Sequence, residues 1–310
     1  MDYKHPHQPV LLKEVISLLM TDLNGVYLDG TIGYGGHSEK ILNAISQKGF
    51  LIGMDLDPYA LEYTKVRLSK IRQNYSLHQG NYREYSQLLQ KLGIEKLNGI
   101  LLDLGSSSSQ INTEHRGFSF QKNSPLNMRF NPNEKPNASE YLKQATLDEI
   151  GQIIKKYGEE RNYKKIALNI FNASRKNEMN TTFDLKKAIE KCINPRFANK
   201  SLARVFQAIR IKINNELESL EEALTNSIEW LKKGGRIAII SFHSLEDRIV
   251  KNFFVNKSKT CTCPKKAPIC ICKTIPSLKI LKRKIIRPSK DELILNPRSR
   301  SAKLRSAERI

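Results

Sequence analysis

Residues 26–37 read Val-Tyr-Leu-Asp-Gly-Thr-Ile-Gly-Tyr-Gly-Gly-His, and this stretch decides the fold of the chain. Its first residues form a short apolar run that ends at a glycine-rich turn, a pattern typical of a buried strand. Glycines let backbone amides approach a ligand closely, and the helix expected after the turn offers its positive N-terminus. The stretch therefore predicts a strand, a ligand-binding turn and a helix, the opening of many nucleotide-binding folds.

Apolar runs and helical patterns alternate along the chain on both sides of this stretch. We expect strands over about 26–30, 50–54, 75–78, 99–103 and 235–242. Helical spacing of apolar residues predicts helices over about 10–19 and 38–46. Repeated strand-helix-strand units imply a parallel sheet with helices on both faces, so the sequence predicts a doubly wound, mostly parallel α/β fold.

A long interval separates the strand that ends at Asp103 from the strand that begins at Gly235. One crossover helix with short loops cannot fill it, so we expect an inserted module. Helical patterns run from about 138 to 197, with Thr146 as a capping candidate, and from Leu202 to Leu231, with Gly234-Gly235 as a C-terminal stop.

These patterns predict a sheet domain in two parts with a helical domain inserted between them. The first part of the sheet domain covers 1–109, and the inserted helical substrate-recognition domain covers 110–206. The second part of the sheet domain, which includes a basic C-terminal segment, covers 207–310.

The charge of the chain indicates a polyanionic partner. Lys and Arg number 52 against 31 Asp and Glu, a formal net charge of +21, which suits nucleic acid or an anionic membrane. Residues 256–310 hold 16 of the basic residues and only three acidic ones. Charge alone fits a solvated or disordered tail as well as a binding surface. Apolar residues within the segment favour packing of part of it onto the main sheet; they are Leu278, Ile280, Ile285, Ile286, Leu293 and Leu295.

The sequence gives no sign of export or of a membrane span. No run of about 18 apolar residues is present, and the N-terminus lacks the apolar core of a signal peptide. Four of the five cysteines crowd between Cys261 and Cys272, unlike the spread framework of a disulfide-stapled secreted domain. We expect a soluble protein of the cytoplasm without a membrane partner.

The crowded cysteines are Cys261, Cys263, Cys270 and Cys272, which form two Cys-x-Cys pairs. Such a group could hold tetrahedral zinc or could mark a variable surface insertion. Each pair is tighter than the usual two-residue spacer, so we assign no metal ligand from the sequence.

The glycine turn is followed by acidic residues at the ends of later strands. The turn lacks the third glycine of the dinucleotide fingerprint and the lysine of a phosphate loop, so neither NAD nor ATP is well matched. Asp55 closes the second strand, where a carboxylate can accept the ribose hydroxyls of an adenosine moiety. Asp103 closes the fourth strand, near the point where such sheets reverse their order and bind ligands.

Ordered motifs along nearly the whole chain resemble those of the bacterial small-subunit ribosomal RNA (cytosine-N4)-methyltransferases. The motifs are His7 with residues 9–15, residues 29–38, residues 101–105 with Ser107, Ser108 and Gln110, and residues 116–120, 241–248 and 296–305. The resemblance implies a class I S-adenosylmethionine-dependent methyltransferase with a Rossmann-like sheet and an inserted small helical domain. It implies methylation of the exocyclic amine of a cytidine in the decoding region.

The resemblance also implies the site residues and the partners. Cofactor contacts are expected from Gly35, Gly36, His37, Asp55, Tyr82, Asp103 and Gln110. The implied substrate is small-subunit ribosomal RNA, free or in the assembled small ribosomal subunit, and a homodimer is left open. We expect Asp103, or a neighbouring backbone oxygen, to accept a hydrogen bond from the cytosine amine. His243 is the candidate imidazole base, and the other interpretation is a packed or capping histidine.

Two departures from the family pattern concern the residues near the acceptor. Ser109 stands where the family has proline, and Asn127 stands where it has aspartate. An amide at 127 can hydrogen-bond but cannot take a proton.

The residues themselves leave two other functions open. One is a basic RNA-binding protein without catalysis, which predicts steep salt dependence and no cofactor binding. The other is a methyltransferase of DNA or protein. Against DNA, residues 103–106 read Asp-Leu-Gly-Ser in place of the Asn/Asp-Pro-Pro-Tyr motif of DNA amino-methyltransferases.

Overall fold

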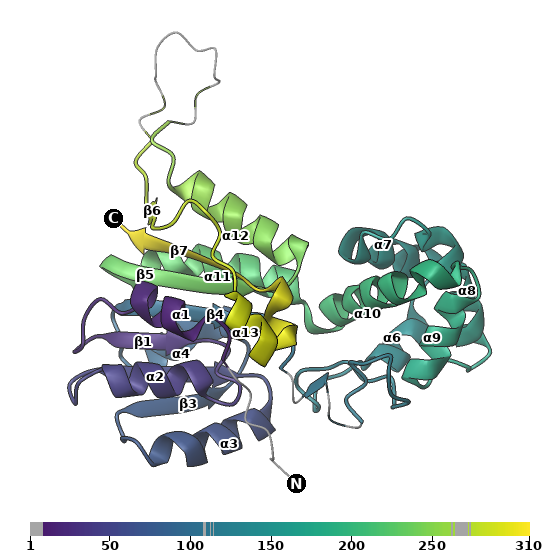
Figure 1. The fold of residues 1–310 in the computed structure, drawn as a ribbon, viewed down its shortest axis with the longest axis horizontal. Helices are drawn as coiled ribbons and strands as arrows, with labels where there is room; N and C mark the ends of the chain where they lie inside the picture. Colours follow the sequence, from purple (N-terminus) through teal and green to yellow (C-terminus); the bar gives the residue numbers. More distant parts are fainter. Residues whose placement is uncertain are drawn as a thin grey trace. The chain divides into compact units, whose positions relative to one another are not determined.

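The computed structural model describes residues 9–107, 110–111, 113, 115–261, 263, 272 and 274–310, and it divides into two compact units (Figure 1). A sheet unit comprises Met1–Gly105 and Leu217–Ile310, and a helical unit comprises Ser106–Glu216. The helical unit ends beyond the expected residue 206 because α10 (Ala198–Asn214) continues unbroken to Asn214 while it packs on α7 (Leu147–Gly158).

The sheet unit is built on seven strands in the order β3-β2-β1-β4-β5-β7-β6. The strands are β1 (Val26–Asp29), β2 (Phe50–Asp55), β3 (Tyr75–Gln79), β4 (Leu97–Asp103), β5 (Leu231–Ser241), β6 (Leu278–Ile280) and β7 (Lys303–Arg309). Every pairing is parallel except those of β7 with β5 and with β6. The doubly wound, mostly parallel sheet is confirmed, and its order reverses between β1 and β4.

Helices cover both faces of this sheet (Figure 1). They are α1 (Leu12–Leu19), α2 (Gly36–Ala44), α3 (Pro58–Ser69), α4 (Tyr85–Lys91), α11 (Glu216–Trp230) and α12 (Ser244–Lys257). Alternate residues of β1 lie on opposite faces of the sheet. Tyr27 belongs to the apolar cluster that includes residues of α1, α2 and α3, while Leu28 belongs to the cluster that includes residues of α4, α11 and α12. No helix in the described part of the chain has both the length and the apolar character needed to cross a bilayer.

The basic C-terminal segment folds onto the sheet, as expected. Leu278 is buried in β6, and Ile286 forms an isolated bridge with Leu304 of β7. The last apolar pair of the segment, Leu293 and Leu295, does not pack in the same way. Both residues lie in α13 (Lys290–Leu295), where Leu295 is 73% exposed. That short helix is held instead by Glu292, whose carboxylate accepts the Leu11 N–H at 2.7 Å. The 3-10 turn η3 (Pro297–Ser301) then leads into β7.

The helical unit contains α6 (Ala138–Gln144), α7, α8 (Tyr163–Arg175), α9 (Thr182–Glu190), the 3-10 turn η2 (Pro195–Phe197) and α10. Three of its helices, α6, α7 and α9, begin at capping boxes. The Thr146 hydroxyl accepts the Glu149 N–H, and the Glu149 carboxylate accepts the Thr146 N–H, which confirms the predicted cap.

The expected continuous helix from 202 to 231 is wrong. Asn215, with φ of 48°, adopts the left-handed conformation that ends α10, and α11 starts at the next residue. Asn tolerates this conformation better than most residues, so it can end a helix without glycine. Gly234 is not a helix stop, because β5 already begins at Leu231.

Shortening a core side chain of the central strand should destabilise the sheet unit. Leu28 is fully buried, and we expect Leu28→Ala to lower the free energy of unfolding by about 2–5 kcal/mol, because it removes apolar contacts and leaves a cavity. The matched control is Leu23→Ala, at a side chain that is 59% exposed, with an expected loss below about 0.5 kcal/mol. Urea titration of both variants measures the difference; equal losses would contradict the assigned core.

Candidate functional site

The glycine turn between β1 and α2 is fixed by its backbone conformation and by two neighbouring side chains. Gly33 and Gly35 have φ of 49° and 75°, which favours glycine at both positions. A Cβ on Gly35 would lie 2.9 Å from Cγ2 of Thr64. The Thr64 hydroxyl donates to the Gly33 carbonyl at 2.7 Å, so α3 holds the turn from one side. The turn therefore presents backbone rather than side chains before α2 begins.

Asp55, at the end of β2, holds the same turn from the other side. Its Oδ2 accepts the Gly33 N–H at 2.8 Å, and its Oδ1 accepts the Asp57 N–H at 2.9 Å. An ionised carboxylate has about four acceptor sites, so it can serve the backbone and a ligand hydroxyl together. The structure thus gives Asp55 a positioning role that the sequence did not suggest.

Asp103, at the end of β4, lies opposite His37 of α2. The Asp103 N–H donates to Thr31 Oγ1 at 2.6 Å, and Oδ2 lies 3.6 Å from His37 Nδ1. His37 Nε2 lies 2.9 Å from the Val10 carbonyl, which can only accept, so Nε2 carries a proton. The structure therefore places a buried imidazole beside the carboxyl group of Asp103.

The other oxygen of Asp103 has no hydrogen-bond partner among the described residues. Oδ1 is buried, and a buried acceptor without a donor is costly for the fold. Burial raises the pKa of Asp103 well above its usual range, and the charges of Asp29 and Glu246 raise it further. The end of β4 therefore offers a ligand an unsatisfied acceptor that also binds a proton readily.

Asp29 and Glu246 are members of the site that sequence reasoning missed. Asp29 is 1% exposed, and burial raises its pKa to about 7, although the Ser38 hydroxyl and the Thr31 N–H hydrogen-bond to it. Its place at the end of the first strand, directly before Gly30, was the available signal, because parallel strands end at one edge. Glu246 lies in the 241–248 motif but could not be placed next to Asp103 without the fold.

Tyr82 lies beside the turn, whereas Gln110 belongs to the other unit. Tyr82 starts the 3-10 turn η1 (Tyr82–Glu84) after β3, and a Cβ on Gly30 would lie 3.0 Å from the Tyr82 Cβ. Gln110 is buried in the helical unit, where its Oε1 accepts the Ser107 N–H at 3.0 Å.

The structure thus gathers six predicted residues at one edge of the sheet: Gly35, Gly36, His37, Asp55, Tyr82 and Asp103. Four of the residues singled out in the sequence lie outside the described part of the chain, namely His7, Ser108, Ser109 and Cys270.

His243, the candidate base, caps the N-terminus of α12 after β5. Its Nδ1 accepts the Glu246 N–H at 3.4 Å, while Glu246 Oε2 accepts the N–H groups of Phe242 and His243 at 2.8 and 3.3 Å. Nε2 lies 3.1 Å from Glu246 Oε1, near enough for attraction but not aligned for a hydrogen bond. The capping geometry is therefore present, and a catalytic role for His243 stays a prediction.

Asn127, the departure from the family pattern, has a local partner within the helical unit. Its Oδ1 accepts from Arg129 Nε at 2.7 Å. Nearby, the buried Arg116 donates to the carbonyl of Phe130 at 2.9 Å. The amide oxygen of Asn127 is thus enough to hold the arginine of this loop.

Known proteins resemble this chain over nearly its whole length. A model described as the MraW methylase family matches residues 4–310. A ribosomal RNA small subunit methyltransferase H from Trichlorobacter lovleyi is 44% identical over 307 residues, 98% of each chain. A protein of the same name from Heliobacterium mobile is 45% identical over 309 residues, 98% of this chain and 99% of that protein. A solved rRNA methylase from Streptococcus thermophilus aligns with a TM-score of 0.44 at 11% identity, over 96% of this chain and 93% of that one.

The raised pKa of Asp29 predicts a pH dependence of stability. The folded chain keeps the proton of Asp29 up to about pH 7, while the unfolded chain loses it near the ordinary value of 3.8. Between these values the folded state binds more protons, so the stability from this group is lost as pH rises towards 7. Relative to Asp29→Asn, which does not titrate, the wild-type free energy of unfolding should fall by up to about 1.4 kcal/mol per pH unit over this window.

Denaturant titrations of both proteins between pH 4 and pH 8 measure this difference. Asp291→Asn, at an exposed position, is the control and should show no such slope. Parallel pH profiles for wild type and Asp29→Asn would refute a neutral Asp29 in the folded state.

Proposed function

Because the chain belongs to the MraW methylase family, we propose that it methylates the exocyclic amine of a cytidine in the decoding region of small-subunit ribosomal RNA. The chain is an S-adenosylmethionine-dependent ribosomal RNA methyltransferase that modifies a small-subunit cytidine. The proposal adds three points to this activity: the exocyclic amine as the methylated atom, the decoding region as its place, and the roles of single residues. The observation that carries them is the buried Oδ1 of Asp103 beside the glycine turn, for which no described residue supplies a hydrogen bond.

The residues at the edge of the sheet suit S-adenosylmethionine. When bound, this cofactor supplies a methyl group that its sulfonium charge activates. Gly35, Gly36 and the start of α2 would face it with backbone, Asp55 would accept its ribose hydroxyls, and Tyr82 would offer a ring to the adenine. Gln110 would contribute from the helical unit.

The acidic cluster of Asp29, Asp103 and Glu246 suits a cationic ligand. Negative neighbours and burial raise the pKa of Asp103, and a positive charge placed beside it acts in the opposite direction. Binding of a sulfonium cation would therefore favour the Asp103 carboxylate, the form that accepts hydrogen bonds. His37 lies beside this carboxyl group, with its Nδ1 3.6 Å from Asp103 Oδ2.

The proposed role of Asp103 is to position the cytosine amine. The lone pair of this amine is delocalised into the ring, so orientation and exclusion of water must supply most of the catalysis. A hydrogen bond from the amine to Asp103 would direct the nitrogen towards the methyl group. The reaction forms a nitrogen–carbon bond, breaks the carbon–sulfur bond and releases one proton from the nitrogen.

The charge of the C-terminal segment supports an RNA substrate. Exposed basic residues follow β6 in close succession, namely Lys282, Arg283, Lys284 and Arg287. Such side chains contact phosphates and contribute affinity without reading bases. We propose that the substrate is presented with its cytidine unstacked, in the assembled small subunit, and that the enzyme acts in the cytoplasm.

Methyl transfer to small ribosomal subunits tests this function directly. Subunits that lack the modification are incubated with methyl-labelled S-adenosylmethionine, and the digested RNA is analysed for methylated cytidine. We expect N4-methylated cytidine with the wild-type chain, and a loss of about a hundredfold to a thousandfold in rate for Asp103→Asn. Asp291→Asn, at an exposed carboxylate, is the matched control.

Two outcomes of this experiment would contradict the proposal. An Asp103→Asn chain with full activity and normal cofactor affinity would remove the role of Asp103. Salt-dependent RNA binding without cofactor binding would favour a non-catalytic RNA-binding protein, and calorimetry with the cofactor decides that point.

Two substitutions separate the capping role of His243 from a base role. Asn is a good N-cap, so His243→Asn should keep the stability of the chain, while His243→Ala should lose about 1 kcal/mol. Because both ring nitrogens of His243 face Glu246, we expect His243→Asn to keep methyl transfer within a few-fold. Thermal melting and the rate are measured together. A stable His243→Asn chain with a large loss of rate would instead assign a base role.

A further inference from the structure

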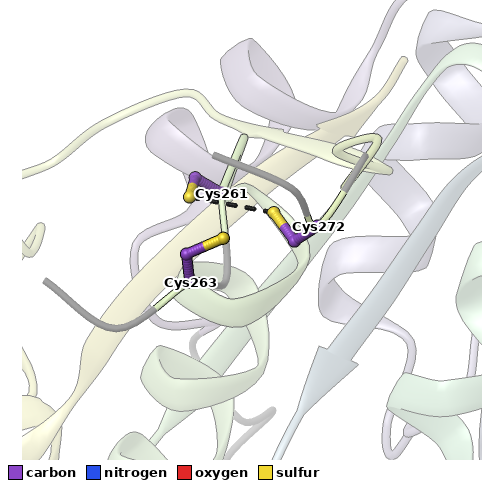
Figure 2. A group of neighbouring side chains, drawn as sticks. All are labelled: Cys261, Cys263 and Cys272. Atoms are coloured by element: carbon purple, nitrogen blue, oxygen red, sulfur yellow. Dashed lines mark hydrogen bonds between the residues drawn. The ribbon is translucent and has the colours of Figure 1, made fainter. Parts of the chain in front are cut away.

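Three cysteines gather beyond the end of α12. The sulfurs of Cys261, Cys263 and Cys272 all lie within 4.8 Å of one another (Figure 2). Cys261 and Cys263 come from one Cys-x-Cys pair, and Cys272 comes from the other. The tight spacing within a pair, which seemed unfavourable for a metal, does not prevent both sulfurs of the first pair from facing the third.

The distances suit a shared metal ion better than a disulfide. Cys261 Sγ and Cys272 Sγ are 3.7 Å apart. A tetrahedral zinc ion at about 2.3 Å from each sulfur separates neighbouring sulfurs by about 3.8 Å. A disulfide brings two sulfurs to about 2.05 Å and would leave the third cysteine without a role.

The surroundings of the sulfurs favour thiolates. The Thr274 hydroxyl donates to Cys272 Sγ at 3.1 Å, as groups around a metal site do when they support its ligands. Lys257 and Lys259 lie shortly before Cys261 in the chain. Three thiolates around a divalent cation leave one net negative charge, which a basic segment offsets.

Little apolar packing holds the described returning end of the loop that carries these cysteines. It leaves the sheet unit after α12 and returns at β6, and its base is closed by a hydrogen bond from the Ser277 N–H to the Lys257 carbonyl at 2.8 Å. Ile275, an apolar residue close to the returning end, is 86% exposed and builds no core. Short segments without an apolar core are commonly held by a metal ion or a disulfide.

We propose that Cys261, Cys263 and Cys272 bind a structural zinc ion that fastens the loop between α12 and β6. The site needs thiolates and a borderline-soft divalent cation, which is the donor chemistry of structural zinc. It takes no part in methyl transfer. Cys270 lies outside the described residues.

Metal analysis of the purified full chain tests this proposal. The protein is loaded with zinc sulfate, desalted without chelator and analysed by mass spectrometry for metal and protein. We expect one zinc ion per chain in wild type and a loss of most of it in Cys261→Ser/Cys272→Ser and in Cys263→Ser. The matched control is Cys192→Ser, which replaces the remaining cysteine of the described chain, in the helical unit, and should keep the zinc.

A spectroscopic measurement excludes indirect loss through unfolding. Cobalt loaded in place of zinc should give the intense visible absorption of tetrahedral cobalt thiolate in wild type and Cys192→Ser, and not in the loop variants. Circular dichroism should show the sheet unit folded in all of them. Zinc well below one ion per chain in wild type, zinc retained in the double variant, or an intact mass that shows a disulfide between loop cysteines would each overturn the proposal.

Discussion

The parallel pairing of β1 with β4 is the constraint on which the rest of the molecule depends. Tyr27 lies opposite Gly99 in this pairing, and a Cβ on Gly99 would approach the Tyr27 ring to 2.6 Å, so a side chain at 99 would force the strands apart. One step further along, the Gly30 N–H donates to the Leu101 carbonyl at 3.0 Å. The strand order reverses between these two strands, so the pairing creates the place where the turn, Asp29 and Asp103 come together.

This place is poorly suited to stability and well suited to binding. Buried carboxylates destabilise a fold; burial raises the pKa of both Asp29 and Asp103, and the charge of Asp29 raises that of Asp103 further. Asp103 has a buried oxygen without a hydrogen-bond partner in the described chain, although an apolar residue at this position would destabilise the folded state less. A cationic cofactor removes part of this cost when it binds, because it neutralises the cluster and favours the ionised form of Asp103. The buried carboxylates thus lower the stability of the free chain, and cofactor binding would recover part of that free energy.

The sequence predicted strands β1 to β5 and the turn, and it singled out six residues that the fold brings to one edge of the sheet, because these features follow from local rules. Apolar runs mark buried strands, and the ends of parallel strands share an edge, so the order of residues alone places Asp55 and Asp103 together. Glu246 could not be placed in this way, since its position depends on how α12 packs on β5, β6 and β7. The break at Asn215 was also hidden, because a left-handed residue leaves the helical spacing of apolar residues on either side unchanged. Long-range packing, not composition, decides such features.

The net charge shows the same limit of sequence reasoning. Part of the basic C-terminal segment serves the fold, since Lys303 and Arg305 on β7 pair with Asp247 of α12 at 3.3 and 2.7 Å. These two cations cannot be counted as a surface for RNA, although they contribute to the formal charge of the segment. The side chains of Lys282, Arg283, Lys284 and Arg287 are exposed, and only the backbone of Ile286 between them pairs with β7. The charge of a segment therefore indicates a polyanionic partner only after the cations that hold the sheet together have been set aside.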